Sequence, residues 1–328
     1  MAVVVASQPL DLLAAGFFPG VPGSTPAEAA TPESAVLREP DGTMVYLGGE
    51  FAVSGGEVVG GTITSLGEEW PATGDLYASS GVDIAWEEYL GFRDTGNSFG
   101  FVFRLLRGDD EVYGSDGADR LVGFDGSDLV DGGRGDDDVN GNTGADTVWG
   151  GNGRDFVRGG QGEDLVFGGN GDDWHVNGNI GNDTVLGGAG SDTVYGGQNA
   201  DLLFGDYGDG SAFGGNDHLI GNLGRDSLYG EDGNDTLEGG EGFDVFYFQS
   251  GGGDDHILDL SLGEDLIAIE SGINGTILVE GAPFSAIQGR LATVGADTLL
   301  DLGDGNTVTI VGILPGQLQA ANFIYFDA

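Results

Sequence analysis

Residues 150 to 166 read GGNGRDFVRGGQGEDLV and contain almost two copies of one nine-residue pattern. In each copy two glycines precede a variable residue, a third glycine, another variable residue and an aspartate; a valine stands two positions after the aspartate. Glycine adopts positive φ angles without steric cost, whereas valine favours strands. Each copy therefore predicts a tight turn followed by a short strand, with the aspartate at the junction.

The pattern continues on both sides and gives fourteen units between Gly114 and Tyr247. The sixth position is aspartate in every unit: Asp119, Asp128, Asp137, Asp146, Asp155, Asp164, Asp173, Asp183, Asp192, Asp201, Asp217, Asp226, Asp235 and Asp244. The eighth position is apolar in thirteen of the fourteen units, and we assign the polar exception to His175, beside a one-residue insertion.

A strand of three residues is not stable alone, so the units must stack and bury their eighth-position side chains against one another. If successive units form opposite walls of a flattened coil, units two apart become vertical neighbours. They would then pair as parallel strands about 4.8 Å apart, and fourteen units would form a rod about 34 Å long. The sequence thus predicts an all-β solenoid of parallel strands.

The same stacking places the aspartates in two columns of seven, with Asp119 near Asp137 and Asp128 near Asp146. Bare carboxylates in such columns would repel one another. A hard dication between successive turns, held by carboxylates and by turn carbonyls, would remove this repulsion. Calcium fits best, because it accepts six to eight oxygen ligands in flexible geometry. The gaps allow at most about twelve calcium ions.

These units resemble the RTX proteins, which carry hemolysin-type calcium-binding repeats. The resemblance covers about 135 residues and implies a parallel β-roll, all fourteen aspartates as calcium ligands, and folding coupled to calcium binding. It also implies export by type I secretion machinery that reads an uncleaved C-terminal signal. The first thirty residues contain no Lys or Arg and so lack the basic region of a secretory signal peptide, which agrees with this route.

Three units depart from the pattern. Residues 168 to 177 contain one extra residue, residues 205 to 220 contain about seven, and Asn199 replaces the fourth-position glycine. We therefore expect the calcium sites at Asp173, Asp201 and Asp217 to differ from the others.

Composition limits the partners of this protein. Fifty-five acidic residues face ten basic ones, for a formal charge of −45. This charge excludes non-specific binding to nucleic acid and argues against docking on anionic membranes. There is no cysteine, and no apolar run reaches the about 18 residues of a membrane span. Calcium is the expected partner, and the expected location is extracellular or at the cell surface.

Four segments are expected: a leader and linker (1–39), a β-rich N-terminal module (40–106), the β-roll (107–247), and a C-terminal cap with the secretion signal region (248–328). In the N-terminal module we expect strands at 43–49, 50–56, 57–66 and 99–106. Trp70 and Trp86 are core residues or ligand-stacking residues there. After the roll, strands are expected from TILVEG, RLATVG, DTLLDLG, NTVTIVGI and NFIYFDA.

No catalytic motif stands out. The three histidines are far apart, no H-E-x-x-H or G-x-S-x-G sequence occurs, and the glycine clusters lack the lysine of a phosphate-binding loop. We therefore expect a non-enzymatic secreted protein with a structural or adhesive role at a cell surface or in a matrix. The alternative is a secreted toxin or enzyme whose activity resides in residues 40–106.

Positions seven and nine of each unit should point outward. On one wall they form a nearly continuous apolar ladder that includes Trp149, Phe167, Phe204 and Tyr229. Exposed apolar strips of this size normally mark an interface. Either a terminal β module folds over the ladder, or the ladder joins copies of the protein into dimers or filaments.

Overall fold

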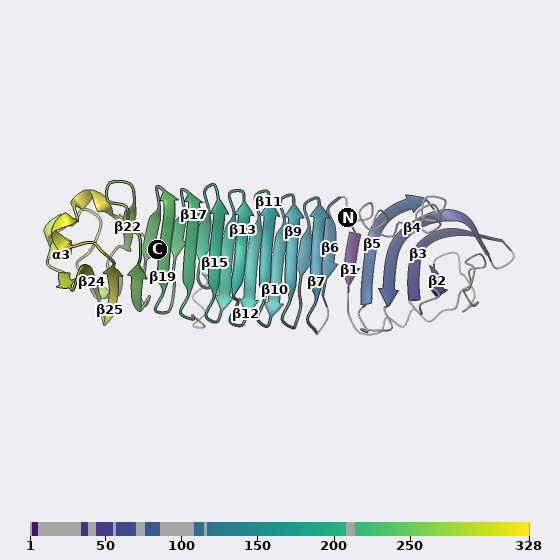
Figure 1. Cartoon of the computed structure of the whole chain (residues 1–328), viewed down its shortest axis with the longest axis horizontal. Coiled ribbons are helices and arrows are strands. Elements are labelled where there is room, and N and C mark those ends of the chain that lie inside the picture. Colours follow the sequence, from purple (N-terminus) through teal and green to yellow (C-terminus); the bar gives the residue numbers. More distant parts are fainter. Residues whose placement is uncertain are drawn as a thin grey trace.

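The computed structural model describes residues 2–5, 34–38, 44–54, 57–69, 76–85, 108–114, 117–207 and 214–327, with the backbone alone before residue 108. Trp70, Trp86 and the strand expected at 99–106 lie outside the described residues. The protein is an all-β solenoid in which two eleven-stranded sheets face each other along a rod (Figure 1). The fold class predicted from the repeat is confirmed.

The first sheet, which we call the A sheet, is parallel throughout. Its order along the rod is β1 (Ala2–Val5), β6 (Asp110–Tyr113), β8 (Leu129–Asp131), β10 (Thr147–Asn152), β12 (Leu165–Asn170), β14 (Thr184–Ala189), β16 (Leu202–Phe204), β18 (Ser227–Tyr229), β20 (Val245–Phe248), β22 (Leu266–Glu270) and β26 (Phe323–Phe326).

The second sheet, the C sheet, forms the facing wall. Starting from its N-terminal end, its order is β7 (Arg120–Asp125), β9 (Asp138–Thr143), β11 (Phe156–Gln161), β13 (His175–Ile180), β15 (Thr193–Gln198), β17 (His218–Gly224), β19 (Thr236–Gly242), β21 (Asp254–Ile257), β25 (Asn306–Ile310), β24 (Asp297–Gly303) and β23 (Leu291–Val294). Only the last two pairings, β25 with β24 and β24 with β23, are antiparallel.

Units two apart are paired, as the nine-residue period predicts. Val148 lies opposite Val166 in the β10–β12 pair, 18 residues apart. The seven-residue insertion lengthens one such step without changing the register, because Val194 of β15 lies opposite Leu219 of β17. Successive units therefore alternate between the two sheets, and the strands on either side of the insertion keep the register of the repeat.

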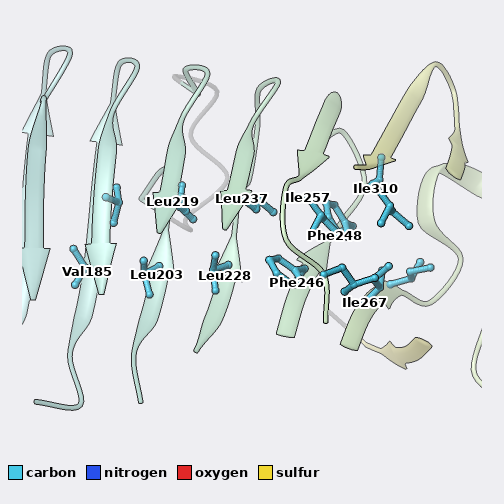
Figure 2. Packing of buried hydrophobic residues seen from close by; sticks show 14 of the residues in the cluster. Val185, Leu203, Leu219, Leu228, Leu237, Phe246, Phe248, Ile257, Ile267 and Ile310 are labelled. Carbon is cyan, nitrogen blue, oxygen red and sulfur yellow. The ribbon is translucent and has the colours of Figure 1, made fainter. Parts of the chain in front are cut away.

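The core is a double row of eighth-position side chains between the sheets. Figure 2 shows Val185, Leu203 and Leu228 from the A sheet near Leu219 and Leu237 from the C sheet, all fully buried. Burial of one such side chain contributes about 1.5–3 kcal/mol. Each unit contributes only one of these residues. The hydrophobic core is therefore continuous along the roll but contains a single eighth-position side chain from each strand.

The turns explain the glycines at positions two and four. In the unit that begins at Gly150, Gly151 has φ 109° and Gly153 has φ 142°, conformations that disfavour residues with a Cβ atom. Asparagine tolerates the left-handed region best among the other residues. It replaces glycine at position two as Asn142 and at position four as Asn199, with φ 84° and 83°.

The assignment of His175 to the core was wrong. Val176 occupies the eighth position and is fully buried, while His175 lies at position seven, opposite Phe156, on the outer face of the C sheet. The extra residue of this unit is Trp174, which is 52% exposed. All fourteen core positions are therefore apolar, since a single inserted residue between aspartate and strand shifts the alignment by one.

The N-terminal part contains strands where a leader and linker were expected. β1 pairs with β6 and thereby belongs to the A sheet of the roll. A separate antiparallel sheet has the order β2 (Ser34–Arg38), β3 (Met44–Ser54), β4 (Glu57–Glu69) and β5 (Leu76–Ala85). The alternation of short β-like runs and glycine turns predicted strands here, but β3 joins the two strands expected at 43–49 and 50–56 into one. β5 was not expected, and β2 lies inside the expected linker.

The C-terminal part continues the roll before capping it. β21 and β22 extend both sheets beyond residue 247, so the repeat pattern ends earlier in the sequence than in the structure. The segment TILVEG is not a strand; Leu278 is buried, and Ile277 is 73% exposed. The cap also contains η1 (Ile273–Gly275), α3 (Phe284–Gln288), η2 (Pro315–Gln317) and η3 (Ala320–Asn322), none of which was predicted.

Candidate metal centre

The sixth-position aspartates stand at the point where each turn enters a strand. Thirteen of the fourteen are no more than 4% exposed, and Asp119, in the first unit, is half-buried. Burial of so many carboxylates is unusual, since acidic side chains are rarely fully buried without a partner. Their surroundings therefore determine what this protein can bind.

From Asp128 onward, one carboxylate oxygen of each sixth-position aspartate has a partner in the previous coil. The backbone N–H of Asp128 donates to Oδ1 of Asp146 at 2.8 Å, and that of Asp146 donates to Oδ1 of Asp164 at 2.9 Å. These bonds create the two columns that the register predicts. One column runs through Asp119, Asp137, Asp155, Asp173, Asp192, Asp217, Asp235 and Asp255, and the other through Asp110, Asp128, Asp146, Asp164, Asp183, Asp201, Asp226, Asp244 and Asp265.

The unusual units remain in these columns. The N–H groups of Asp155, Asp183 and Asp192 donate to Asp173, Asp201 and Asp217 at 2.7, 2.9 and 2.8 Å. Neither the extra Trp174 nor the insertion before Asp217 displaces the aspartate from its column. The departures from the repeat therefore leave this part of the geometry intact.

The second carboxylate oxygen of these aspartates has no hydrogen-bond donor. Oδ2 is buried and unpaired in thirteen members of the two columns: Asp128, Asp137, Asp146, Asp155, Asp164, Asp173, Asp183, Asp192, Asp201, Asp217, Asp226, Asp235 and Asp244. An unpaired buried charge costs several kcal/mol unless a proton or a cation neutralises it. The columns thus present a regular series of unsatisfied acceptors.

The first-position glycine makes room for this oxygen. A Cβ atom added to Gly150 would lie 2.7 Å from Oδ2 of Asp155 and 2.3 Å from the carbonyl oxygen of Gly168 in the next coil. Both contacts are too short for a real side chain. Glycine therefore leaves a small space bordered by a carboxylate oxygen and a backbone carbonyl oxygen, which are both ligands that calcium prefers.

Burial raises the pKa of every one of these unpaired carboxyls, and the backbone N–H bond opposes part of that rise. The pKa of Asp146 is raised to about 6, that of Asp192 to about 8 and that of Asp235 to about 9. The charges of Asp217 and Asp173 contribute to the rise at Asp192. A cation between turns would offset both the burial and this mutual repulsion.

The donor set fits a hard divalent cation that accepts backbone ligands. Within residues 108–114, 117–207 and 214–327, no three His, Cys, Asp or Glu side chains converge closely enough to hold a metal ion by themselves. Most ligands would therefore be turn carbonyls. Calcium, which accepts mixed carboxylate and carbonyl oxygens, fits this set better than magnesium, which keeps its water.

The columns are longer than the repeat alone indicates. Asp110, Asp255 and Asp265 occupy the same position at the ends of the roll, and the sequence analysis missed them. Each stands two residues before a buried apolar residue, as in the regular units. That local signal was present, although the glycines before Asp110 and Asp265 do not follow the repeat.

Comparison with known proteins agrees with this geometry. A family model described as "RTX calcium-binding nonapeptide repeat (4 copies)" matches residues 106–139, 140–174, 177–212 and 211–246. Residues 106–246 carry RTX calcium-binding repeats. RTX repeats bind calcium and are generally non-catalytic. The fourteen aspartates lie within these RTX repeats, while their individual roles as ligands remain a prediction.

Two solved structures share similarity with the chain that contains these RTX repeats. The extracellular lipase LipA from Serratia marcescens is 18% identical over 65% of this chain and 39% of the lipase, with a TM-score of 0.32. This chain therefore spans about two fifths of the lipase. The AlgE6R3 subunit of the Azotobacter vinelandii mannuronan C5-epimerase is 29% identical over 42% of this chain and 80% of that subunit, with a TM-score of 0.32.

A search of curated proteins finds no match. In the described part of the chain, none of the helices has the length and apolar character needed to cross a membrane.

Proposed function

We propose that this is a secreted protein whose β-roll folds when calcium fills the gaps between its aspartate columns. The observation that carries the proposal is the series of buried, unpaired Oδ2 atoms, each beside a glycine turn. Bound calcium would supply positive charge there. The protein's own part is to hold Oδ1 with an N–H group, to orient Oδ2 toward the gap, and to exclude water from it.

Circular dichroism of the full chain tests this proposal. In excess chelator we expect a largely disordered chain, and added calcium should restore the β-rich spectrum, because binding that requires the folded turns contributes to folding free energy. Extracellular calcium sites commonly bind at about 0.1–1 mM. A spectrum that is fully β-rich in chelator contradicts the proposal, and equal recovery with magnesium contradicts selectivity for calcium.

Export in an unfolded state by type I secretion machinery follows from calcium-dependent folding. The charge of −45 keeps the calcium-free chain expanded, and folding outside the cell would begin only where calcium is abundant. We place the protein outside the cell or at its surface, in a structural or adhesive role. A screen of the full chain against hydrolase substrates tests the alternative, an activity within residues 40–106.

The outer face of the A sheet favours self-association. Trp149 stacks on Phe167 with ring centroids 3.7 Å apart, and Tyr229 stacks on Phe204 and Tyr247 at 4.8 and 4.1 Å. These rings are half-buried. On a protein with a charge of −45, a second copy that presents the same nearly uncharged face is a suitable partner.

A further inference from the structure

The outer face of the C sheet carries a cluster of aromatic rings outside the core. Phe156 of β11 stacks on His175 of β13 with ring centroids 4.3 Å apart, and His175 contacts Tyr195 of β15 at 4.7 Å. The inserted Trp174 lies 4.7 Å from Phe156 and 6.1 Å from His175. We call these four residues the C-face cluster. Its rings recur on three consecutive strands, which are about 4.8 Å apart along the rod.

Trp174 is the exposed member of the C-face cluster. Its side chain is 52% exposed, whereas the other three residues are half-buried. Contacts with Phe156 and His175 restrict the orientation of the indole, which lowers the entropy cost of binding a ligand to it. The strand that follows keeps its register, because Val176 still lies opposite Val194. The insertion therefore adds an exposed and supported ring without disturbing the sheet.

Polar side chains border the rings. The guanidinium of Arg158 lies over the Phe156 ring, 4.6 Å from its centroid, and pairs with Asp138. Nδ2 of Asn177 lies 3.4 Å from Nε2 of His175. Burial, followed by the charge of Arg158, lowers the pKa of His175, so its imidazole is uncharged at neutral pH and offers one donor and one acceptor. Donors and acceptors thus stand beside the exposed indole.

The charge of this face differs from that of the whole chain. At positions seven and nine of β7, β9, β11, β13 and β15, the charged residues are Arg120, Arg158 and Asp138, a formal balance of +1. Arg120 pairs with Asp138 at 3.4 Å. The chain of −45 repels polyanions, and this face has no excess of acidic groups to attract a cation. The face therefore suits an uncharged ligand.

We propose that the C-face cluster binds a chain of uncharged pyranose sugars, with Trp174 as the stacking residue. A pyranose ring presents C–H bonds that pack on the electron-rich face of an indole, and its hydroxyl groups require donors and acceptors close by. Arg158 and Asn177 supply such groups. Consecutive sugar units can follow consecutive strands along the rod. The inference rests on the proposed adhesive role and deepens it, since it names the chemistry to which the protein adheres.

Affinity electrophoresis of the full chain in calcium tests the proposal. The gels contain hydroxyethylcellulose, galactomannan or dextran as uncharged polysaccharides, or hyaluronan as a polyanion. We expect at least one uncharged polysaccharide to slow the unchanged protein. Trp174→Ala should raise the dissociation constant about tenfold or more, because aromatic anchors carry a large share of the binding free energy at an interface. Trp174→Phe retains a ring and should keep most of the affinity.

A matched control comes from the same sheet. Leu258, directly after β21 and three strands beyond β15, is 37% exposed, and Leu258→Ala should leave the dissociation constant unchanged. Circular dichroism in calcium verifies that each variant is folded. Sedimentation measures whether Trp174→Ala changes the mass in solution.

Three results would overturn the proposal. In the first, no uncharged polysaccharide slows the folded, unchanged protein, or only hyaluronan does. In the second, Trp174→Ala binds as tightly as Leu258→Ala. In the third, Trp174→Ala lowers the mass in solution, which would assign the cluster to a contact between copies. Failure of calcium to fold the unchanged chain contradicts the proposed function instead.

Discussion

The middle and the C-terminal end of the same aspartate column differ in how their buried carboxylate oxygens are paired. In the middle, Asp146 accepts one N–H bond through Oδ1 and leaves Oδ2 buried without a donor. At the end, Asp265 accepts N–H bonds through both oxygens, from Asp244 at 3.0 Å and from Ser261 at 2.6 Å. Nearby, Asp259 also accepts two, from Gly239 and Gly240. The middle coils therefore leave one buried carboxylate oxygen for a proton or a cation to neutralise, whereas the end stabilises its carboxylates with backbone donors.

Removal of calcium should produce the largest difference between the middle coils and the C-terminal end. We expect hydrogen exchange to show that amides between Asp128 and Tyr247 lose protection in chelator, because their carboxylates repel one another there. Amides of β24 and β25 in the cap should keep more of their protection. Hydrogen exchange with mass spectrometry, with and without calcium, measures both regions. Equal loss in the cap and in the middle coils would show that the cap depends on the cation to the same degree.

Single substitutions should sharpen the difference. Asp146→Asn retains an oxygen for the Asp128 N–H but removes the charge beside two gaps, so the calcium midpoint of folding should rise about tenfold or more. Asp265→Asn loses one of two accepted bonds and should cost about 1–2 kcal/mol of thermal stability, with little effect on the calcium midpoint. Calcium titrations and melting curves followed by circular dichroism separate these outcomes. Equal calcium midpoints for the two variants would contradict the comparison.

The pH dependence should be opposite with and without calcium. Aspartates whose folded-state pKa lies at about 6 to 9, above the ordinary 3.8, favour the folded state when protonated. That contribution is complete below 3.8 and is lost as pH rises through 6 to 9. The calcium-free chain should therefore gain structure on acidification from pH 8 to 5.

With calcium present, protons compete for the same oxygens, so the calcium midpoint should rise over that pH interval. Circular dichroism at fixed calcium concentrations measures both effects. A calcium midpoint that does not change between pH 8 and 5 would show that protons and calcium do not share these carboxylates.

The smallest effect is expected on the outer face of the A sheet. Trp149→Ser combined with Phe204→Ser should lower the mass in solution if this face joins two copies, while the calcium midpoint changes little, because neither side chain borders a gap. Sedimentation and melting temperature in calcium measure assembly and stability. A double variant with unchanged mass and unchanged melting temperature would show that the ladder has no role in either.

The repeat predicted most of the roll because each unit specifies both where the chain turns and which side chain is buried. A glycine pair, an aspartate and an apolar residue at fixed spacing determine the backbone, the register and the columns at once. Two kinds of error remained. Inserted Trp174 moved the core position from His175 to Val176, since periodicity alone does not locate an insertion within a unit. Asp206, at the start of the seven-residue insertion, is also buried, and its burial was missed because no repeat position predicts a buried acid there.

The ends of the roll were harder to predict. β21 and β22 continue the sheets, but only the turn before β21 keeps glycines at positions two and four, Gly251 and Gly253. The turn before β22 does not follow the glycine pattern, so Asp265 alone marks it. TILVEG has strand-like composition, yet it follows Gly275 and ends at Gly281, whose φ angles are 70° and 79°, and it buries only Leu278 deeply. In the cap, tertiary packing outweighs the local preference for a strand.

Because successive units alternate between the two sheets, a deletion of an even number of units differs in its effect from a deletion of an odd number. Deletion of eighteen residues, for example 150 to 167, would join two coils of the same register and leave every later side chain on its original face. Deletion of nine, for example 159 to 167, would move each later unit to the opposite sheet. Tyr229 and Tyr247 would then leave the face of Trp149, and Tyr195 would join it. The roll can therefore lose or gain an even number of nine-residue units at little cost. An odd number exchanges the outer faces of the A and C sheets in all later units.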